Sequence, residues 1–291
     1  MICALGAAVC FGTASVLQAV AARAAAATDA TDGAGGAGEA GGAGAGVDAA
    51  LFLRAVRQWR YLLGLALDGA GFVLQIIALR HIPIYAVSAA LAASLAVTAV
   101  VAARLLRVRL SRAEWAAVGT VCAGLAMLGL ASGAEGTEEG STALRFAMLG
   151  AAVGILLLGA VLGPRLPEGP RALVLGLAAG TGFGVVEVSV RLIDDPAPAA
   201  LLTNPAFYAL LVGGGAAFLL LTSALARGSV TVATAGMVLG ETVGPALVGV
   251  LWLGDRTRPG LAWLALLGFA VAVAGALALS RFGEPPPAAQ P

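Results

Sequence analysis

Apolar residues run along this chain in long blocks, and short segments between the blocks hold most of its charged residues. A helix needs about 20 consecutive apolar residues to cross the hydrocarbon core of a membrane, whereas a membrane β-strand needs about 10 alternating positions. The length and continuity of the blocks therefore predict an all-α membrane protein. We expect nine transmembrane helices, at residues 1–22, 59–79, 83–103, 113–132, 143–162, 171–192, 207–225, 229–252 and 261–280.

Two polar segments divide the chain further. The first has no aromatic residue and almost no bulky apolar residue, so burial cannot offset the entropy lost on ordering it. We expect residues 1–27 to hold the first helix, 28–50 to be a disordered Gly/Ala-rich cytoplasmic linker, and 51–132 to hold three more helices. Residues 143–280 should hold the remaining five helices, and 281–291 should be a disordered cytoplasmic tail.

The composition excludes most soluble functions. Hydrophobic residues make up 60% of the 291 residues and charged residues 11%, against about 25% charged in soluble domains, and the mean hydropathy is +0.96. The balance of 17 basic and 16 acidic residues creates no field that would attract nucleic acid. Cys3, Cys10 and Cys122 lack metal-binding spacing, and His81 is the single histidine, so we expect no cofactor and no enzymatic activity.

The arginines predict the orientation of the chain. Most of the 17 basic residues, all of them arginine, fall on the side of the membrane that holds the Gly-rich linker. Cytoplasmic loops carry the excess of positive charge in membrane proteins. We therefore expect a multi-pass protein of the plasma membrane with its N-terminus outside and its C-terminus in the cytoplasm.

The chain contains an internal repeat with a period of 146 residues. Residues 59–132 align with 205–278 without a gap, so that Gly69 meets Gly215 and Arg112 meets Arg258. The predicted topology places the two copies in opposite orientations, giving halves of four and five helices. Inverted repeats of this kind are typical of secondary transporters.

Residues 72–128 and 218–279, which carry this repeat, resemble the drug/metabolite transporter superfamily of EamA-like proteins. Typical members have two halves of five helices, and here the second helix of the first half is missing where the Gly-rich linker stands. Nine helices with this gap, together with Gly12, Ser15 and Gln18 in the first helix, resemble the NIPA-type magnesium transporters. The resemblance implies transport of a small solute or cation by alternating access, with Mg²⁺ as one alternative.

Glu241 is the strongest candidate for a binding residue. It lies about 18 Å into its predicted helix, where an ionisable side chain is costly unless it faces a cavity or a partner. Pro245 has no N–H, so the carbonyl group of Glu241 loses its helical partner beside the Thr242 hydroxyl group. Hard cations prefer oxygen ligands of these kinds, and a proton-coupled carrier needs a carboxylate that titrates.

Four more residues are candidates for substrate or ion binding. Asp68 lies about 14 Å into its helix and would join Glu241 as a ligand if the cargo is Mg²⁺. Glu187 lies near the outer end of its helix with Arg191 four residues later, a spacing typical of an ion pair. Gln18 and Gln75 can form hydrogen bonds between helices.

The sequence therefore favours a secondary transporter of the drug/metabolite transporter type. The alternatives are a NIPA-type Mg²⁺ transporter and a non-transporting membrane scaffold or lipid-binding protein. The expected partners are membrane lipids and a small-molecule or cation substrate, with no nucleic acid, and the sequence leaves open whether the chain forms a homodimer.

Overall fold

The computed structural model describes residues 2–33, 49–79, 93–106, 110–133, 136, 140–195 and 197–281. These residues are almost entirely helical and contain no strand. The helices are α1 (Ile2–Gly33), α2 (Ala49–Val56), α3 (Trp59–Leu79), α5 (Ser94–Leu105), α6 (Arg112–Ala131), α7 (Thr142–Leu162), α8 (Glu168–Arg191), α9 (Pro198–Thr203), α10 (Pro205–Arg227), α11 (Val230–Trp252) and α12 (Ala262–Arg281), with one 3₁₀ turn at Gly163–Arg165.

Seven of these helices are long and apolar enough to cross a membrane, namely α1, α6, α7, α8, α10, α11 and α12. The chain is therefore a helical, multi-pass membrane protein. Helix α3 has the bounds that were predicted for residues 59–79 but is not among these seven helices, and α5 forms the later part of the helix predicted at 83–103. Residues 80–92, which include His81, lie outside the described residues, so the count of nine spans stays a prediction.

Helix α1 is longer than the sequence pattern predicts. It continues to Gly33, although the segment apolar enough to span a membrane ends at Ala27. Helix α2 begins at Ala49, so both helices enter the range 28–50 that was expected to be disordered. The linker residues 34–48 and the tail residues 282–291 lie outside the described residues, and the predictions for them stay predictions.

Polar caps explain why several helices begin where they do. Ser111 accepts a hydrogen bond from the Glu114 N–H group, and the Glu114 side chain accepts one from the Ser111 N–H group, which is a complete capping box at the start of α6. The side chains of Ser141, Asn204 and Ser229 accept hydrogen bonds from N–H groups at the starts of α7, α10 and α11. These caps satisfy donors that have no partner inside the helix.

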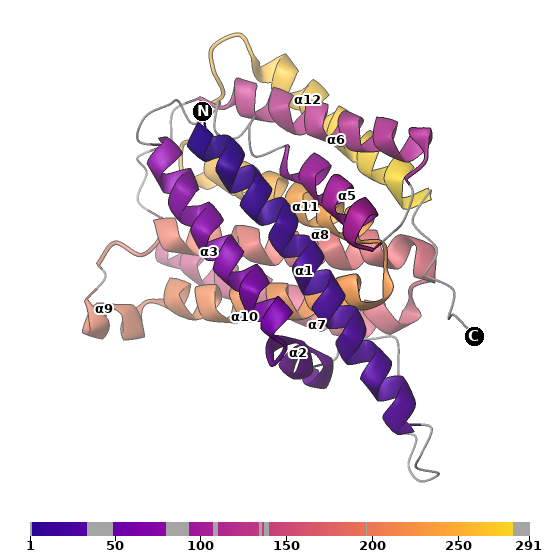
Figure 1. Cartoon of the computed structure of the whole chain (residues 1–291). Helices are drawn as coiled ribbons and strands as arrows, with labels where there is room; N and C mark the ends of the chain where they lie inside the picture. Colours follow the sequence, from indigo (N-terminus) through magenta and orange to yellow (C-terminus); the bar gives the residue numbers. More distant parts are fainter. Residues whose placement is uncertain are drawn as a thin grey trace.

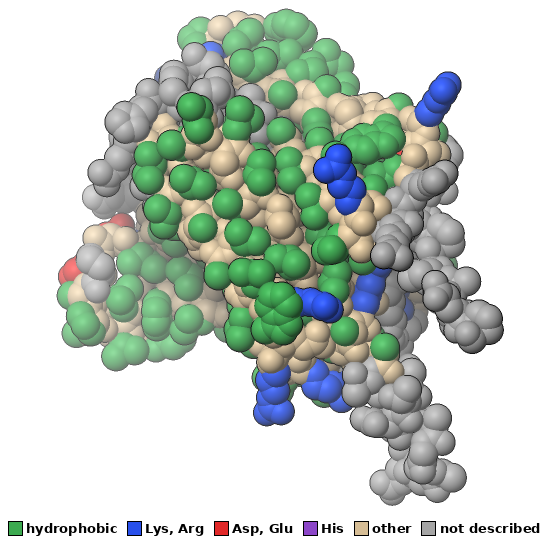
Figure 2. Space-filling view, viewed as in Figure 1, with side chains coloured by type: hydrophobic (Ala, Val, Ile, Leu, Met, Phe, Trp, Pro, Cys, Tyr) green, Lys and Arg blue, Asp and Glu red, His purple; other side chains and the backbone are tan. Residues whose placement is uncertain are grey.

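The helices pack in three groups (Figure 1). Helix α8 packs most extensively against α11 and α10, α1 packs against α3 and α5, and α6 packs against α12. The α6–α12 pair is antiparallel, because Gly124 contacts the backbone of Ala272 while Gly275 contacts Val121. Hydrophobic side chains are spread over the face shown in Figure 2, as expected for a surface in contact with lipid.

Polar contacts join the helices at both ends of the bundle. At the end that holds α2, which we call the arginine end after Arg54, Arg57 and Arg60, Arg23 of α1 donates hydrogen bonds to the carbonyl oxygens of Leu225 and Gly228. These carbonyls belong to the last turn and cap of α10, where cationic side chains are favourable. At the opposite end, which we call the Asp255 end, the Arg258 N–H group donates to the Ala131 carbonyl oxygen.

Candidate functional site

Glu241 lies within electrostatic range of two carboxyl groups from other helices. Asp68 lies on α3, Glu187 on α8 and Glu241 on α11, and the first two are close enough to Glu241 to interact with it electrostatically. Asp68 is about 14 Å from the start of α3 and Glu241 about 17 Å from the start of α11, at about 1.5 Å per residue. Both positions are near the middle of a hydrocarbon core of about 30 Å.

The three acidic side chains are not sealed inside packed protein. Glu187 is exposed, and Asp68 and Glu241 are half-buried. A carboxyl group within a membrane is costly unless it has water or a partner. Each of these side chains therefore requires water, a cargo or a neighbouring group as its partner.

Asp68 has an amide partner. The Gln18 side chain of α1 donates a hydrogen bond of 2.7 Å from its Nε2 atom to Asp68 Oδ2, and Gln18 is buried. An amide carries both donors and an acceptor, so it can bind a carboxylate or, after rotation, a protonated carboxyl group. Gln18 is thus suited to a partner that changes its protonation state.

Gly64 gives Gln18 the room to make this bond. A Cβ atom at Gly64 would lie 2.8 Å from Gln18 Cγ and 3.2 Å from the Ala14 carbonyl oxygen. Gly64 precedes Asp68 by one helical turn, so the two residues share the face of α3 that meets α1. Gly71 similarly admits the ring of Phe11, whereas a Cβ atom at Gly69 would meet nothing within 4 Å.

Glu241 is held by the contact between α8 and α11. Helix α11 continues through Pro245, and the Pro245 ring lies where a side chain on Gly184 of α8 would be, with Cδ 2.7 Å from the position of a Cβ atom. Proline removes the N–H group that would otherwise bond to the Glu241 carbonyl. Gly184 and Glu187 are three residues apart, so both lie on the side of α8 that adjoins α11.

The remaining candidates are Thr242 on α11 and Gln75 on α3. The Thr242 hydroxyl group donates to the Val238 carbonyl oxygen at 2.7 Å, which leaves its oxygen free to act only as an acceptor. Gln75 is half-buried on α3, two turns beyond Asp68. Among the described residues, no three His, Cys, Asp or Glu side chains are grouped closely enough to hold a metal ion.

Arg191 has a partner that its position in the sequence does not reveal. It forms a bidentate ion pair with Asp255, with nitrogen–oxygen distances of 2.8 and 2.9 Å. The Gly136 N–H group also donates to Asp255 at 2.6 Å. The spacing of Glu187 and Arg191 indicated an ion pair within α8, whereas this bond joins α8 to the segment between α11 and α12.

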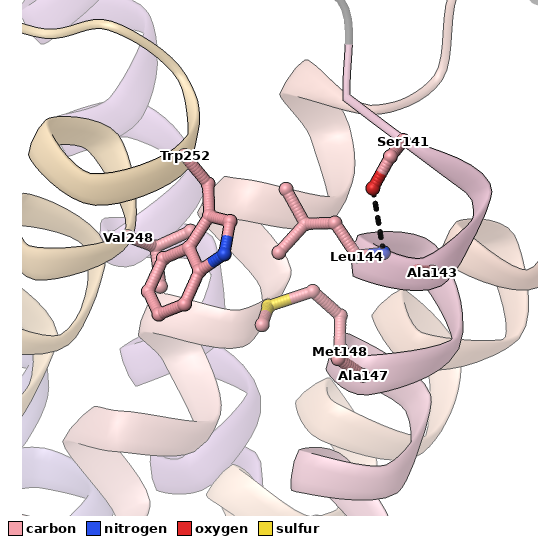
Figure 3. A pocket seen from close by; sticks show the side chains of 7 residues that line it. All are labelled: Ser141, Ala143, Leu144, Ala147, Met148, Val248 and Trp252. Carbon is pink, nitrogen blue, oxygen red and sulfur yellow. Dashed lines mark hydrogen bonds between the residues drawn. The ribbon is translucent and has the colours of Figure 1, made fainter.

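A separate groove lies between α7 and α11 near the Asp255 end (Figure 3). Its volume is about 310 Å³, and its lining includes Leu144, Met148, Val248 and Trp252. The Ser141 hydroxyl group at its edge accepts a hydrogen bond from the Leu144 N–H group. The lining is mainly apolar and includes none of the three carboxyl groups, so we treat the groove as distinct from the candidate site.

Comparisons of the chain with protein-family models, with curated proteins and with solved structures give no match. The resemblance to the drug/metabolite transporter superfamily therefore rests on the sequence pattern alone.

Proposed function

We propose that this protein is a secondary transporter of the drug/metabolite transporter type, which moves a small solute or cation by alternating access. The observation that carries the proposal is that Glu241, near the middle of α11, lies within electrostatic range of Asp68 on α3 and of Glu187 on α8. Transporters commonly place substrate and ion sites near the membrane midplane, between helices that move relative to one another.

In this proposal the carboxyl groups bind a cation or a proton. Two carboxyl groups that share a site disfavour ionisation of each other, so a proton or a cationic substrate relieves their repulsion when it binds. Gln18 stays bonded to Asp68 in either protonation state. Exchange of a bound proton for bound cargo would then couple proton transport to cargo transport.

The proposed movement is a rocking of the two halves of the repeat against each other. Helix α3 begins at Trp59 and α10 at Pro205, the spacing of 146 residues on which the repeat is based. Tyr61 of α3 and Thr222 of α10 share a hydrogen bond of 2.9 Å, and Arg23 joins α1 to the end of α10. We infer that these contacts between the halves hold the arginine end together in this conformation and break when the halves rock apart.

We also propose the membrane location, number of spans and orientation that the sequence predicts. The protein would lie in the plasma membrane with nine spans, its N-terminus outside and its arginine end in the cytoplasm. The positive-inside rule supports this orientation.

Glu241→Gln tests the coupling role. The substitution keeps size and hydrogen bonding but removes the charge, so we expect an intact fold and at least a tenfold loss of coupled flux. Glu241→Asp should keep partial flux with a changed pH dependence. Asp195→Asn, which removes an exposed carboxyl group outside the site, is the control and should transport normally.

The measurement is flux into proteoliposomes, with wild-type transport established first. The panel contains Mg²⁺, amines, sugars and amino acids, so that it also tests the magnesium alternative. Full flux in Glu241→Gln would overturn the coupling role of this residue. A wild-type protein that moves none of the panel, with or without a proton gradient, would favour the scaffold alternative.

A further inference from the structure

Helix α2 and the residues that lead into α3 form an elbow, residues 49–60, across the arginine end of the bundle (Figure 1). Its inner side is fixed by packing: Leu51 and Ala55 are buried, and Ala55 joins a cluster with Ala21, Ala25 and Tyr61. The orientation of the elbow is therefore set by contacts of α2 with α1, α10 and α3.

The outer side of the elbow combines apolar and cationic side chains. Leu53 is 61% exposed and Trp59 is 67% exposed, and Arg57 and Arg60 are exposed beside them. The Arg60 guanidinium group lies 5.7 Å from the centre of the Trp59 ring. Figure 2 shows basic side chains projecting at the lower edge, next to hydrophobic surface.

We infer that this side lies at the level of the lipid headgroups. The segment of α1 that is long and apolar enough to span a membrane ends at Ala27, close to the elbow, and α3 begins within the elbow at Trp59. Tryptophan favours this boundary because its ring is apolar and its N–H group is polar. The elbow contains arginines and no acidic residue, which makes its charge complementary to anionic lipid.

We propose that the elbow is a binding surface for the headgroups of anionic phospholipids. Arg57 and Arg60 contact the phosphate groups, while Leu53 and Trp59 enter the upper part of the acyl-chain layer. An amphipathic helix with this division of side chains lies in the plane of the membrane surface. The surface is separate from the carboxyl groups of the candidate site and does not depend on transport.

The test measures lipid preference in the full-length protein. We would reconstitute it in phosphatidylcholine nanodiscs with spin-labelled phosphatidylglycerol or phosphatidylcholine and determine the relative association constant by electron paramagnetic resonance. Wild type should prefer phosphatidylglycerol, and the preference should fall as NaCl rises from 50 to 500 mM, because salt screens exposed charges. Arg57→Gln and Arg60→Gln should each lower it by up to about fivefold, the factor that corresponds to ~1 kcal/mol per basic residue.

The matched control is Arg256→Gln, which removes an exposed arginine at the Asp255 end. It should change the preference much less than either elbow variant, and Arg57→Lys should retain it. Equal effects of all three Arg→Gln variants would overturn the proposal, because the preference would then follow net charge alone. No preference in wild type would overturn it as well.

A second measurement locates Trp59 directly. In a variant with Trp115, Trp252 and Trp263 replaced by Phe, lipids brominated near the headgroup end of the acyl chain should quench Trp59 more strongly than lipids brominated near the chain end. Quenching by an aqueous quencher alone would contradict insertion of the elbow.

Discussion

Asp68 and Asp255 show how two identical side chains differ through their partners. Asp68 lies within the bundle and has an amide partner, Gln18, which carries no charge of its own. Asp255 lies in the segment between α11 and α12, where the Arg191 guanidinium group donates to both of its oxygens. Hydrogen bonds from Arg191, with a further one from the Gly136 N–H group, hold the pKa of Asp255 below its usual value. We infer from this contrast that Asp68 can exchange its hydrogen-bond partner, whereas Asp255 keeps its ion pair with Arg191.

The Asp255 ion pair predicts a stability effect that depends on pH. Asp255→Asn should lower the free energy of unfolding by about 1–2 kcal/mol, since bonds to charged groups contribute about 1.5–3 kcal/mol and partial exposure reduces this. A lowered folded-state pKa stabilises the protein above the unfolded pKa of about 3.9, and this stability is lost as pH falls through the folded value. Thermal unfolding in detergent should therefore show a constant difference between wild type and variant from pH 5 to 8, and a shrinking one below pH 4. A difference that grows on acidification would contradict this assignment.

At the scale of elements, the pairing of α8 with α11 determines the candidate site. Gly176 and Gly180 of α8 face the carbonyl oxygens of Ala233 and Met237, and Gly240 of α11 faces that of Leu177. Small residues allow helix backbones to approach closely in a membrane, where apolar side chains gain little by leaving lipid. This close approach brings Glu187 and Glu241 near each other.

Gly180→Ala should disrupt this pairing. A Cβ atom there would overlap the Met237 carbonyl oxygen, and a backbone atom cannot move aside as a flexible side chain can. We expect a loss of about 1–3 kcal/mol in unfolding free energy, together with reduced flux. Gly154→Ala on α7 is the control, because its Cβ atom would meet nothing within 4 Å, and it should be neutral or slightly stabilising. Equal thermal unfolding of the two variants would argue against close packing at Gly180.

At the scale of the whole molecule, the two ends of the bundle differ in their polar contacts. The arginine end carries the elbow and the bonds from Arg23 to α10. The Asp255 end carries ion pairs between acidic and basic residues, Arg191 with Asp255 and Arg145 with Asp194. Cytoplasmic segments carry the excess of basic residues, so the position of Arg54, Arg57 and Arg60 together at the arginine end supports the orientation that we propose.

Single cysteines test the orientation. On a background with Cys3, Cys10 and Cys122 replaced by Ala, Thr257→Cys at the Asp255 end should react with a membrane-impermeant thiol reagent in intact cells. Ala49→Cys at the arginine end should react only after the membrane is permeabilised. Both positions are exposed, and neither substitution changes an arginine. The reverse pattern would show that the N-terminus is cytoplasmic.

The positions of most helices follow from local patterns in the sequence. The length of an apolar block and a cap such as Ser111 with Glu114 depend only on residues that are close in the sequence. The six helices predicted from residue 113 onward therefore agree to within three residues at each end with α6, α7, α8, α10, α11 and α12. The depth of Asp68 and Glu241 in their helices also follows from residue counting. Helix α1 exceeded its predicted end because an Ala-rich segment keeps a high helix propensity after it ceases to be apolar enough for the membrane.

The contacts between residues of different helices depend instead on how the helices pack. The bonds from Gln18 to Asp68 and from Arg191 to Asp255 join residues 50 and 64 positions apart, and no periodicity within one helix relates them. In a soluble protein, an apolar stripe shows which face of a helix is buried. In a membrane both the core and the lipid are apolar, so hydrophobicity does not distinguish the packed face from the exposed one. Close contacts at glycines such as Gly64 and Gly180 determine the packed face. These contacts can be identified only when the position of the neighbouring helix is known.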